Sequence, residues 1–242
     1  ADNTVRVLSV APGTAASAGG TGVNLLGDDV TVTGYPPPAE PIVNADGTRA
    51  LLITPVINST TLVTKAAVIN TATGKQAGAT LTLPGLAVST MLTADGTRAL
   101  IITSTPNTTT GIDTTRVTVV NMTTGAPMPG ALTFVGYPTG VELLGTHNGR
   151  VLITTDEGDA GTWYVTRLAV INTVTGVQVG AGLSVDGYAA GTQLLGVDAG
   201  RALVTTYDGD AGAGDVTRLA VINTVTGMQA GNTVNLLGKA FD

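Results

Sequence analysis

One short motif, an apolar strand that ends in asparagine, recurs along this chain at a constant interval. Its asparagines are Asn70, Asn121, Asn172 and Asn223, each 51 residues after the one before. Two other landmarks keep that interval, the glycine that closes the following turn and the basic residue ahead of the motif: Gly74, Gly125, Gly176 and Gly227, and Lys65, Arg116, Arg167 and Arg218. A period shared by three landmarks indicates tandem copies of one supersecondary unit.

Each copy is predicted to contain four short β-strands. A turn ending in Gly-Arg or Gly-Thr-Arg precedes each motif, and the residues after it are rich in β-branched types, as in strands covered on both faces. These second strands are expected at 50–54, 99–103, 151–155 and 202–206. With the motif as third strand, an inner strand such as 141–145 and an outer strand such as 177–185 complete a four-stranded antiparallel meander. Such a unit is the blade of a β-propeller.

The repeats predict one all-β domain over residues 1–242. Four full repeats lie at 39–85, 86–136, 137–187 and 188–238, and residues 1–38 resemble only the back half of a repeat, a half blade. In that half blade, Val5–Val10 takes the place of the third strand and Gly22–Gly34 that of the outer strand. The half blade predicts a five-bladed ring or part of a larger propeller, with a strand edge available for self-association. Tandem β-sandwich modules are the alternative, although four strands are few for a sandwich.

The order of these motifs resembles the YVTN family of β-propeller repeats. The resemblance rests on the turn Asp-Gly-x-Arg, the apolar strand, a variable loop and Val-x-Val-Ile-Asn-Thr-x-Thr-Gly, and it covers residues 36–238. This chain has Leu-Leu-Ile-Thr or Leu-Val-Thr-Thr where that family has Tyr-Val-Thr-Asn. The resemblance implies an extracellular or cell-surface location in a bacterium and names no reaction.

Charge and composition exclude several classes of function. The net charge is −6 and the basic residues are spread over repeat positions, so neither a nucleic acid nor an anionic membrane surface is expected as a partner. Cysteine is absent, which excludes disulfides and thiolate metal sites. The single histidine, His147, excludes a His-rich metal site, and no stretch approaches 18 apolar residues, so membrane insertion is not expected.

A polar slot lies seven residues before each turn glycine. Its occupants are Glu40, Ser89, Glu142 and Gln193. The slot is predicted to open the inner strand, so these side chains would converge on the central channel and offer oxygen ligands to a hard cation such as Ca²⁺. The alternative is a water-filled channel that tolerates polar residues without a ligand.

Tyrosine recurs at a second slot, twelve residues before the same glycines, as Tyr35, Tyr137 and Tyr188. This slot is predicted to lie in the loop from an outer strand to the next inner strand, and such loops gather on one face of a propeller. The rings would form a platform for sugars or a partner protein. Alternatively, each ring seals the gap between neighbouring blades.

The loops between the second and third strands of the last two repeats are acidic. Aspartates alternate there with glycines, which suits calcium coordination by carboxylates and carbonyls: Asp156, Asp159, Asp208, Asp210 and Asp215. The spacing does not meet that of an EF-hand, and a solvated acidic hairpin tip is the alternative. The arginines after the turns, repeated in every copy, are predicted to bind backbone carbonyls or a nearby aspartate.

These features favour a non-enzymatic binding or scaffold propeller of a bacterial cell envelope or surface, which recognises a protein or glycan through its loops and needs no cofactor. One alternative is a calcium-dependent hydrolase of the propeller lactonase type, with the ion held by Glu40 and Glu142. The other is a structural module that assembles through its incomplete blade.

Overall fold

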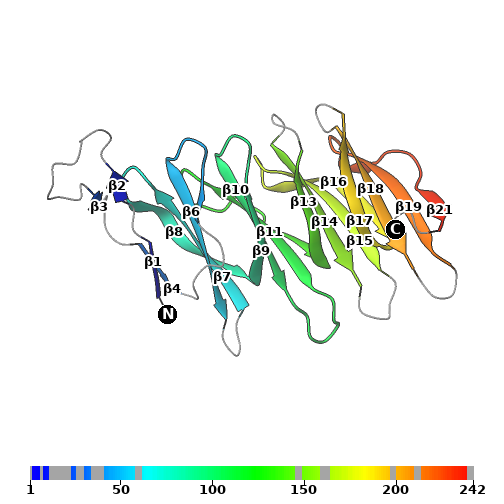
Figure 1. The fold of residues 1–242 in the computed structure, drawn as a ribbon, viewed down its shortest axis with the longest axis horizontal. Helices are drawn as coiled ribbons and strands as arrows, with labels where there is room; N and C mark the ends of the chain where they lie inside the picture. Colours follow the sequence, from blue (N-terminus) through cyan, green and yellow to red (C-terminus); the bar gives the residue numbers. More distant parts are fainter. Residues whose placement is uncertain are drawn as a thin grey trace.

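The computed structural model describes residues 2–5, 8–10, 23–25, 30–33, 41–57, 62–144, 149–158, 164–196, 200–209 and 214–238. Within these residues all regular structure is β, and the antiparallel sheets lie side by side in chain order (Figure 1). The all-β prediction is confirmed.

Each full repeat forms one antiparallel sheet whose strands pair in sequence order. The first sheet holds β5 (Ile42–Val43), β6 (Arg49–Ile57), β7 (Leu62–Asn70) and β8 (Lys75–Pro84). The second holds β9 (Leu86–Leu92), β10 (Arg98–Thr105), β11 (Thr114–Asn121) and β12 (Leu132–Val135).

The third holds β13 (Tyr137–Leu143), β14 (Arg150–Glu157), β15 (Val165–Asn172) and β16 (Val177–Asp186). The fourth holds β17 (Tyr188–Leu195), β18 (Arg201–Asp208), β19 (Val216–Asn223) and an interrupted outer strand, β20 (Met228–Gln229) and β21 (Val234–Leu237). Four-stranded up-and-down sheets packed face to face have the architecture of propeller blades.

The N-terminal segment forms two antiparallel strand pairs. β1 (Asp2–Val5) pairs with β4 (Val30–Thr33), and β2 (Leu8–Val10) pairs with β3 (Val23–Leu25). The segment predicted as a third strand thus pairs with the one predicted as an outer strand. β4 also contacts β6, β7 and β8 of the first sheet.

The stack is open. Among the described residues, no strand pairing joins β1–β4 to the fourth sheet, and the two lie at opposite ends of the molecule (Figure 1). The described residues therefore do not show the closed ring that the half blade predicted, and the final number of blades is not confirmed.

The core lies between the sheets. Each sheet has a leading face toward the preceding sheet and a trailing face toward the following one. Trailing residues Leu168 and Val170 of the third sheet pack on leading residues Val204 and Ile222 of the fourth, and all four are at most 2% exposed. The same alternation joins the first sheet to the second and the second to the third. Burying one such side chain stabilises the fold by about 1.5–3 kcal/mol, so these interfaces are the main source of stability.

Backbone contacts at glycine set how closely neighbouring sheets approach. The turn glycines Gly125 and Gly227 have φ of +69° and +66°. A Cβ added to Gly125 would collide with the carbonyl oxygen of Ala77 in the preceding sheet, and one added to Gly227 with that of Val179. Gly182 N also donates to Gly227 O at 2.9 Å across one of these junctions. At Gly125 and Gly227 glycine is therefore required both by the positive φ and by the carbonyl of the preceding sheet.

Replacing Gly125 with alanine tests this junction. Gly47→Ala is the matched control, because Gly47 has a similar φ of +71° but a Cβ there would meet nothing within 4 Å. Backbone strain costs both variants about 1–2 kcal/mol. We expect Gly125→Ala to lose a further ~1–3 kcal/mol from overpacking, measured as the free energy of unfolding in urea. Equal losses of unfolding free energy in the two variants would show that Gly125 does not lie against the carbonyl of Ala77 in solution.

Candidate functional site

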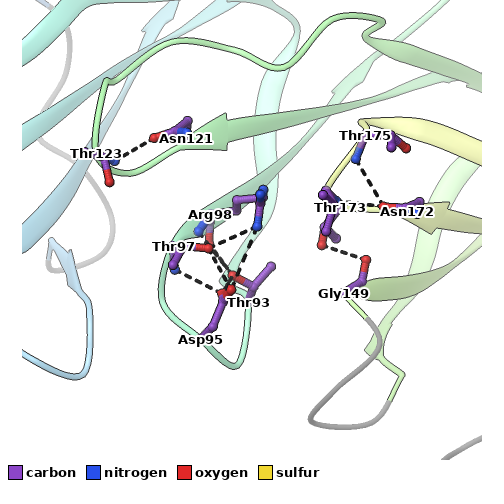
Figure 2. Close-up of polar contacts among 11 residues, drawn as sticks. Thr93, Asp95, Thr97, Arg98, Asn121, Thr123, Gly149, Asn172, Thr173 and Thr175 are labelled. Carbon is purple, nitrogen blue, oxygen red and sulfur yellow. Dashed lines mark hydrogen bonds and ion pairs between the residues drawn. The ribbon is translucent and has the colours of Figure 1, made fainter.

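The edge of the stack that carries the turns is a hydrogen-bonded frame. Asn172 Oδ1 accepts from Val174 N at 2.8 Å and Thr175 N at 3.1 Å, and Thr173 Oγ1 donates to Gly149 O at 2.7 Å (Figure 2). The other motif asparagines accept hydrogen bonds from their turns in the same way. These are Asx-turns, which explains why an asparagine ends every third strand.

The hairpin turn between β9 and β10 is held by a carboxylate. Asp95 accepts from Thr93 Oγ1 at 2.5 Å and from Thr97 N at 3.1 Å, and it lies 3.8 Å from Arg98 (Figure 2). The hydrogen bond from Thr93, followed by those from Thr97, lowers the pKa of Asp95. At the equivalent turn, hydrogen bonds from Thr48 lower the pKa of Asp46.

The turn arginines bind the frame, as predicted, in the first three sheets. Arg49 Nη1 donates to Thr48 O at 2.8 Å, and Arg150 Nη1 to Thr224 O at 3.5 Å. Their charges are thus used within this edge.

The opposite edge, where outer strands pass into the next inner strands, has its own repeated support. A buried threonine near the start of each third strand donates to the carbonyl of a positive-φ glycine. The pairs are Thr64 and Gly85 at 2.9 Å, Thr115 and Gly136 at 2.6 Å, Thr166 and Gly187 at 2.8 Å, and Thr217 and Gly238 at 3.0 Å. Because Tyr137 and Tyr188 directly follow Gly136 and Gly187, these hydrogen bonds hold the backbone from which both tyrosine side chains project.

Three tyrosines form an aromatic cluster on this edge. The ring of Tyr188 lies 6.0 Å from that of Tyr164 and 5.4 Å from that of Tyr207, at interplanar angles of 79° and 74°. Tyr164 and Tyr188 are 39% and 40% exposed. Two glycines lie against the outer rings: a Cβ on Gly158 would approach Tyr164 Cε1 to 2.8 Å, and one on Gly209 would approach Tyr207 Cε1 to 2.8 Å. Glycine at both positions therefore leaves room for the outer rings of the cluster.

The predicted tyrosine row is placed only in part by the structure. Tyr188 is in the cluster, Tyr137 is 48% exposed, and Tyr35 lies outside the described residues. Tyr137 and Tyr188 are strand residues rather than loop residues, because the ladder extends to pair them with Asp156 and Tyr207. Sequence reasoning missed Tyr164 and Tyr207. Had the pairing of β17 with β18 been extended to Tyr188, it would have placed Tyr207 opposite Tyr188. Tyr164 shares its repeat position with no other tyrosine, so no sequence pattern pointed to it.

Carboxylates surround the cluster. Asp215 accepts a hydrogen bond from the Tyr207 hydroxyl, and this bond, with some burial, raises the pKa of Tyr207 to about 12. Asp208 pairs with Arg218 at 3.1 Å, and Glu157 accepts from Arg167 Nε at 2.7 Å. The face therefore combines exposed aromatic surface with hydrogen-bond acceptors.

Asp156 links the third sheet to the fourth. Its carboxylate accepts from Thr166 Oγ1 at 2.9 Å and from Ala189 N at 3.1 Å, at the start of β17. Burial raises the pKa of Asp156, against the opposing effect of the two hydrogen bonds. Asp156 and Asp208 were predicted in loops, but Asp156 is the second-last residue of β14 and Asp208 the last of β18, because both strands extend beyond the apolar pattern.

No group of three or more acidic or histidine side chains in the described ranges is arranged to hold a metal ion. Asp159 and Asp210 lie outside those ranges, so calcium binding by the acidic segments stays a prediction.

The polar slot of the inner strands is only partly described. Ser89, Glu142 and Gln193 lie within β9, β13 and β17, the edge strands of their sheets, rather than at the strand starts. In the described part of the chain, no hydrogen bond or ion pair joins these three side chains. Glu40 lies outside that part, so the separation of Glu40 and Glu142 that a shared calcium ion requires is untested.

A cleft of about 370 Å³ lies between the second and third sheets, beside the outer strands β12 and β16. Phe134, Ile153 and Leu183 supply apolar walls, while Arg167 and Ser184 supply polar groups. Since Arg167 is bound to Glu157 and Ser184, its charge is already compensated. The cleft therefore offers less for recognition than the aromatic cluster.

No family model and no curated protein sequence matches the chain. Solved structures do resemble it. One is the β-propeller domain of the Trilobed protease from Pyrococcus furiosus (9% identity, TM-score 0.46, 83% of this chain and 57% of that chain). Another is Pyrococcus horikoshii acylaminoacyl peptidase (12%, TM-score 0.48, 83% and 32%), and a third is a protein from Lactobacillus plantarum (14%, TM-score 0.42, 95% and 64%).

The chain spans less than two thirds of each of these proteins. The β-propeller assignment therefore rests on the sheet topology, and membership of the YVTN family is not confirmed. No helix among the described residues has the length and hydropathy needed to span a membrane.

The raised pKa of Asp156 predicts a pH-dependent stability. Because the folded-state pKa exceeds the unfolded one, the stability that Asp156 contributes is present below the unfolded pKa and is lost as pH rises through the folded pKa. Asp156→Asn keeps an acceptor oxygen and removes the charge, so its Tm relative to wild type should rise between pH 3 and pH 7. Asp46→Asn is the control of opposite sign, since the contribution of Asp46 is lost as pH falls. A Tm difference for Asp156→Asn that stays constant with pH would contradict this account.

The hydrogen bond between Asp215 and Tyr207 predicts a spectroscopic change. Asp215→Asn should lower the pKa of Tyr207 from about 12 toward its ordinary value of 10.0. Tyrosinate absorbance, with Tyr207→Phe to identify the signal, measures this shift. An unchanged titration would exclude the hydrogen bond in solution.

Proposed function

We propose that this chain is a non-enzymatic binding module of a bacterial cell surface. The edge bearing Tyr164, Tyr188 and Tyr207 is its recognition face, and the partner is a protein or a glycan. The proposed surface location rests on the resemblance of the motif order to YVTN repeats and on the scarcity of lysine.

The aromatic cluster is the observation that carries this proposal. Tyrosine rings offer large contact area with two rotatable bonds each, and they stack on the C–H faces of sugars or on peptide side chains. Asp215 and Asp208 are bound to Tyr207 and Arg218, but each carboxylate keeps further lone pairs that can accept from hydroxyl or amide donors. On the turn edge, the charged side chains of Asp95, Arg49 and Arg98 are bound to the turns themselves. The edge that carries the tyrosines is therefore the better candidate for a recognition face.

Binding to a glycan array and to a peptide array tests the proposal. We expect wild-type protein to bind a subset of one array, and Tyr188→Ala to lower that affinity at least tenfold, because the central ring contacts both others. A loss of one hot-spot aromatic costs about 2 kcal/mol or more at an interface.

Val174→Ala is the matched control, because Val174 is 49% exposed and lies on the turn edge. Thermal unfolding confirms that both variants fold. If Tyr188→Ala binds as wild type does, or both variants lose binding equally, the aromatic cluster is not the recognition face.

A further inference from the structure

One repeat position at the start of the third strands is held through its backbone and differs in its side chain. Its occupants follow each other at 51 residues: Leu62, Asp113, Tyr164 and Asp215. In each repeat the carbonyl oxygen of this residue accepts a hydrogen bond from the N–H of the junction glycine, at 2.7–2.9 Å. Because the hydrogen bond uses the backbone alone, the side chain at this position is available for recognition.

In the last two sheets this position supplies both sides of the aromatic cluster. Tyr164, from the third sheet, places its ring 6.0 Å from that of Tyr188 and nearly perpendicular to it. Asp215, from the fourth sheet, accepts a hydrogen bond from the hydroxyl of Tyr207. Tyr188 and Tyr207 lie directly opposite each other on β17 and β18. The cluster therefore combines rings from two sheets with a carboxylate at its side.

Negative charge beside the rings exceeds positive charge. Glu157 accepts from Arg167 at 2.7 Å, which compensates both charges. Asp208 is paired in the same way with Arg218 at 3.1 Å. Among the described residues, no lysine or arginine forms an ion pair with Asp215, whose side chain is exposed. The carboxylate of Asp215 thus leaves an uncompensated negative charge at the cluster.

The ionisation of Tyr207 responds to this charge. The hydrogen bond to Asp215, then burial and then the negative charges of Asp215 and Asp208 raise the pKa of Tyr207 to about 12. An electrostatic potential that disfavours a phenolate favours a cation at the same place. The net charge of −6 on the whole chain attracts cations at longer range.

We propose that the cluster of Tyr164, Tyr188 and Tyr207 binds a basic side chain, arginine or lysine, of a partner protein. This inference rests on the recognition role proposed above and selects a protein over a glycan as the partner. A cation is attracted to the face of a tyrosine ring, and Asp215 can accept a charge-assisted hydrogen bond from the same group. A neutral or anionic sugar would stack on the rings but would gain nothing from the negative charge.

Two matched peptides test the need for positive charge. The probe is a fluorescent peptide of alternating arginine and glycine, and the reference is the same peptide with citrulline, which is neutral and close to arginine in shape. We expect the full chain to bind the arginine peptide at least tenfold more tightly at low salt, where exposed charges are least screened. Fluorescence anisotropy measures both affinities, and equal values would overturn the proposal.

Two variants test whether the peptide binds at the cluster. Tyr188→Ala removes the central ring and should weaken binding of the arginine peptide at least tenfold. Asp215→Asn keeps the size of the side chain and an acceptor oxygen, and should weaken binding about fivefold, the upper range for an exposed ion pair. Binding of the arginine peptide that neither variant weakens would overturn the proposal.

Asp113→Asn is the matched control. Asp113 occupies the repeat position of Asp215 and carries the same charge, but it lies beside the second sheet, which supplies none of the three rings. Asparagine can still accept the hydrogen bond that Asp113 receives from Ser104 Oγ. This variant should bind the arginine peptide as wild type does. Equal losses in Asp113→Asn and Asp215→Asn would show general attraction to an acidic protein and would overturn the proposal.

Thermal unfolding shows whether each variant folds. If Tyr188→Ala does not fold, the comparison of Asp215→Asn with Asp113→Asn still decides the outcome. Glycan binding that depends on Tyr188, without preference for the arginine peptide over the citrulline peptide, would keep the recognition face and overturn the basic side chain as its ligand. Binding of every array ligand unchanged by a folded Tyr188→Ala would overturn both proposals.

Discussion

The close packing of one sheet on the next is the constraint on which the rest of this structure depends. Each sheet has two apolar faces and is too thin to bury either alone, so its stability comes from its neighbours. Turn glycines such as Gly125 and Gly227 let one backbone lie against the outer strand of the preceding sheet. A change of length at this turn would move the glycine out of contact with the preceding sheet.

The two edges of the stack use their polar side chains differently, and the proposed recognition role belongs to the edge opposite the turns. At the turn edge, asparagine, aspartate and arginine side chains are used to hold the backbone, as Asn172 and Asp95 show. At the opposite edge, hydrogen bonds from buried threonines to glycine carbonyls hold the junctions between outer and inner strands. The side chains of the residues that follow these glycines are not needed for this support, so they can differ between repeats. Among the described residues the tyrosine cluster lies in the last two sheets. The slot of Tyr188 also holds tyrosine in other repeats, whereas the positions of Tyr164 and Tyr207 hold other residues in the first two repeats.

Much of the fold could be predicted from the sequence because the period shows directly which positions are equivalent. The strands after the Gly-Arg turns and those ending in asparagine were predicted within a few residues of their observed bounds. Strand ends were not, because Tyr137 and Asp156 pair by extending a ladder that hydrophobic alternation does not mark. The aromatic cluster was half predicted: Tyr188 shares a repeat slot, but Tyr164 reaches it only through the approach of two sheets. The pairing of Asp156 with Ala189 N is likewise a contact between sheets, which no local pattern shows.

The central claim is that four sheets stack in chain order with the N-terminal strands at the far end. Energy transfer between dyes attached at Ser9→Cys and Leu237→Cys measures the separation of those ends directly, at concentrations low enough to keep the protein monomeric. An open stack predicts low transfer efficiency within the dilute, doubly labelled monomer. High transfer efficiency within the dilute monomer would show that the first strands lie against the last sheet, and would contradict the open stack.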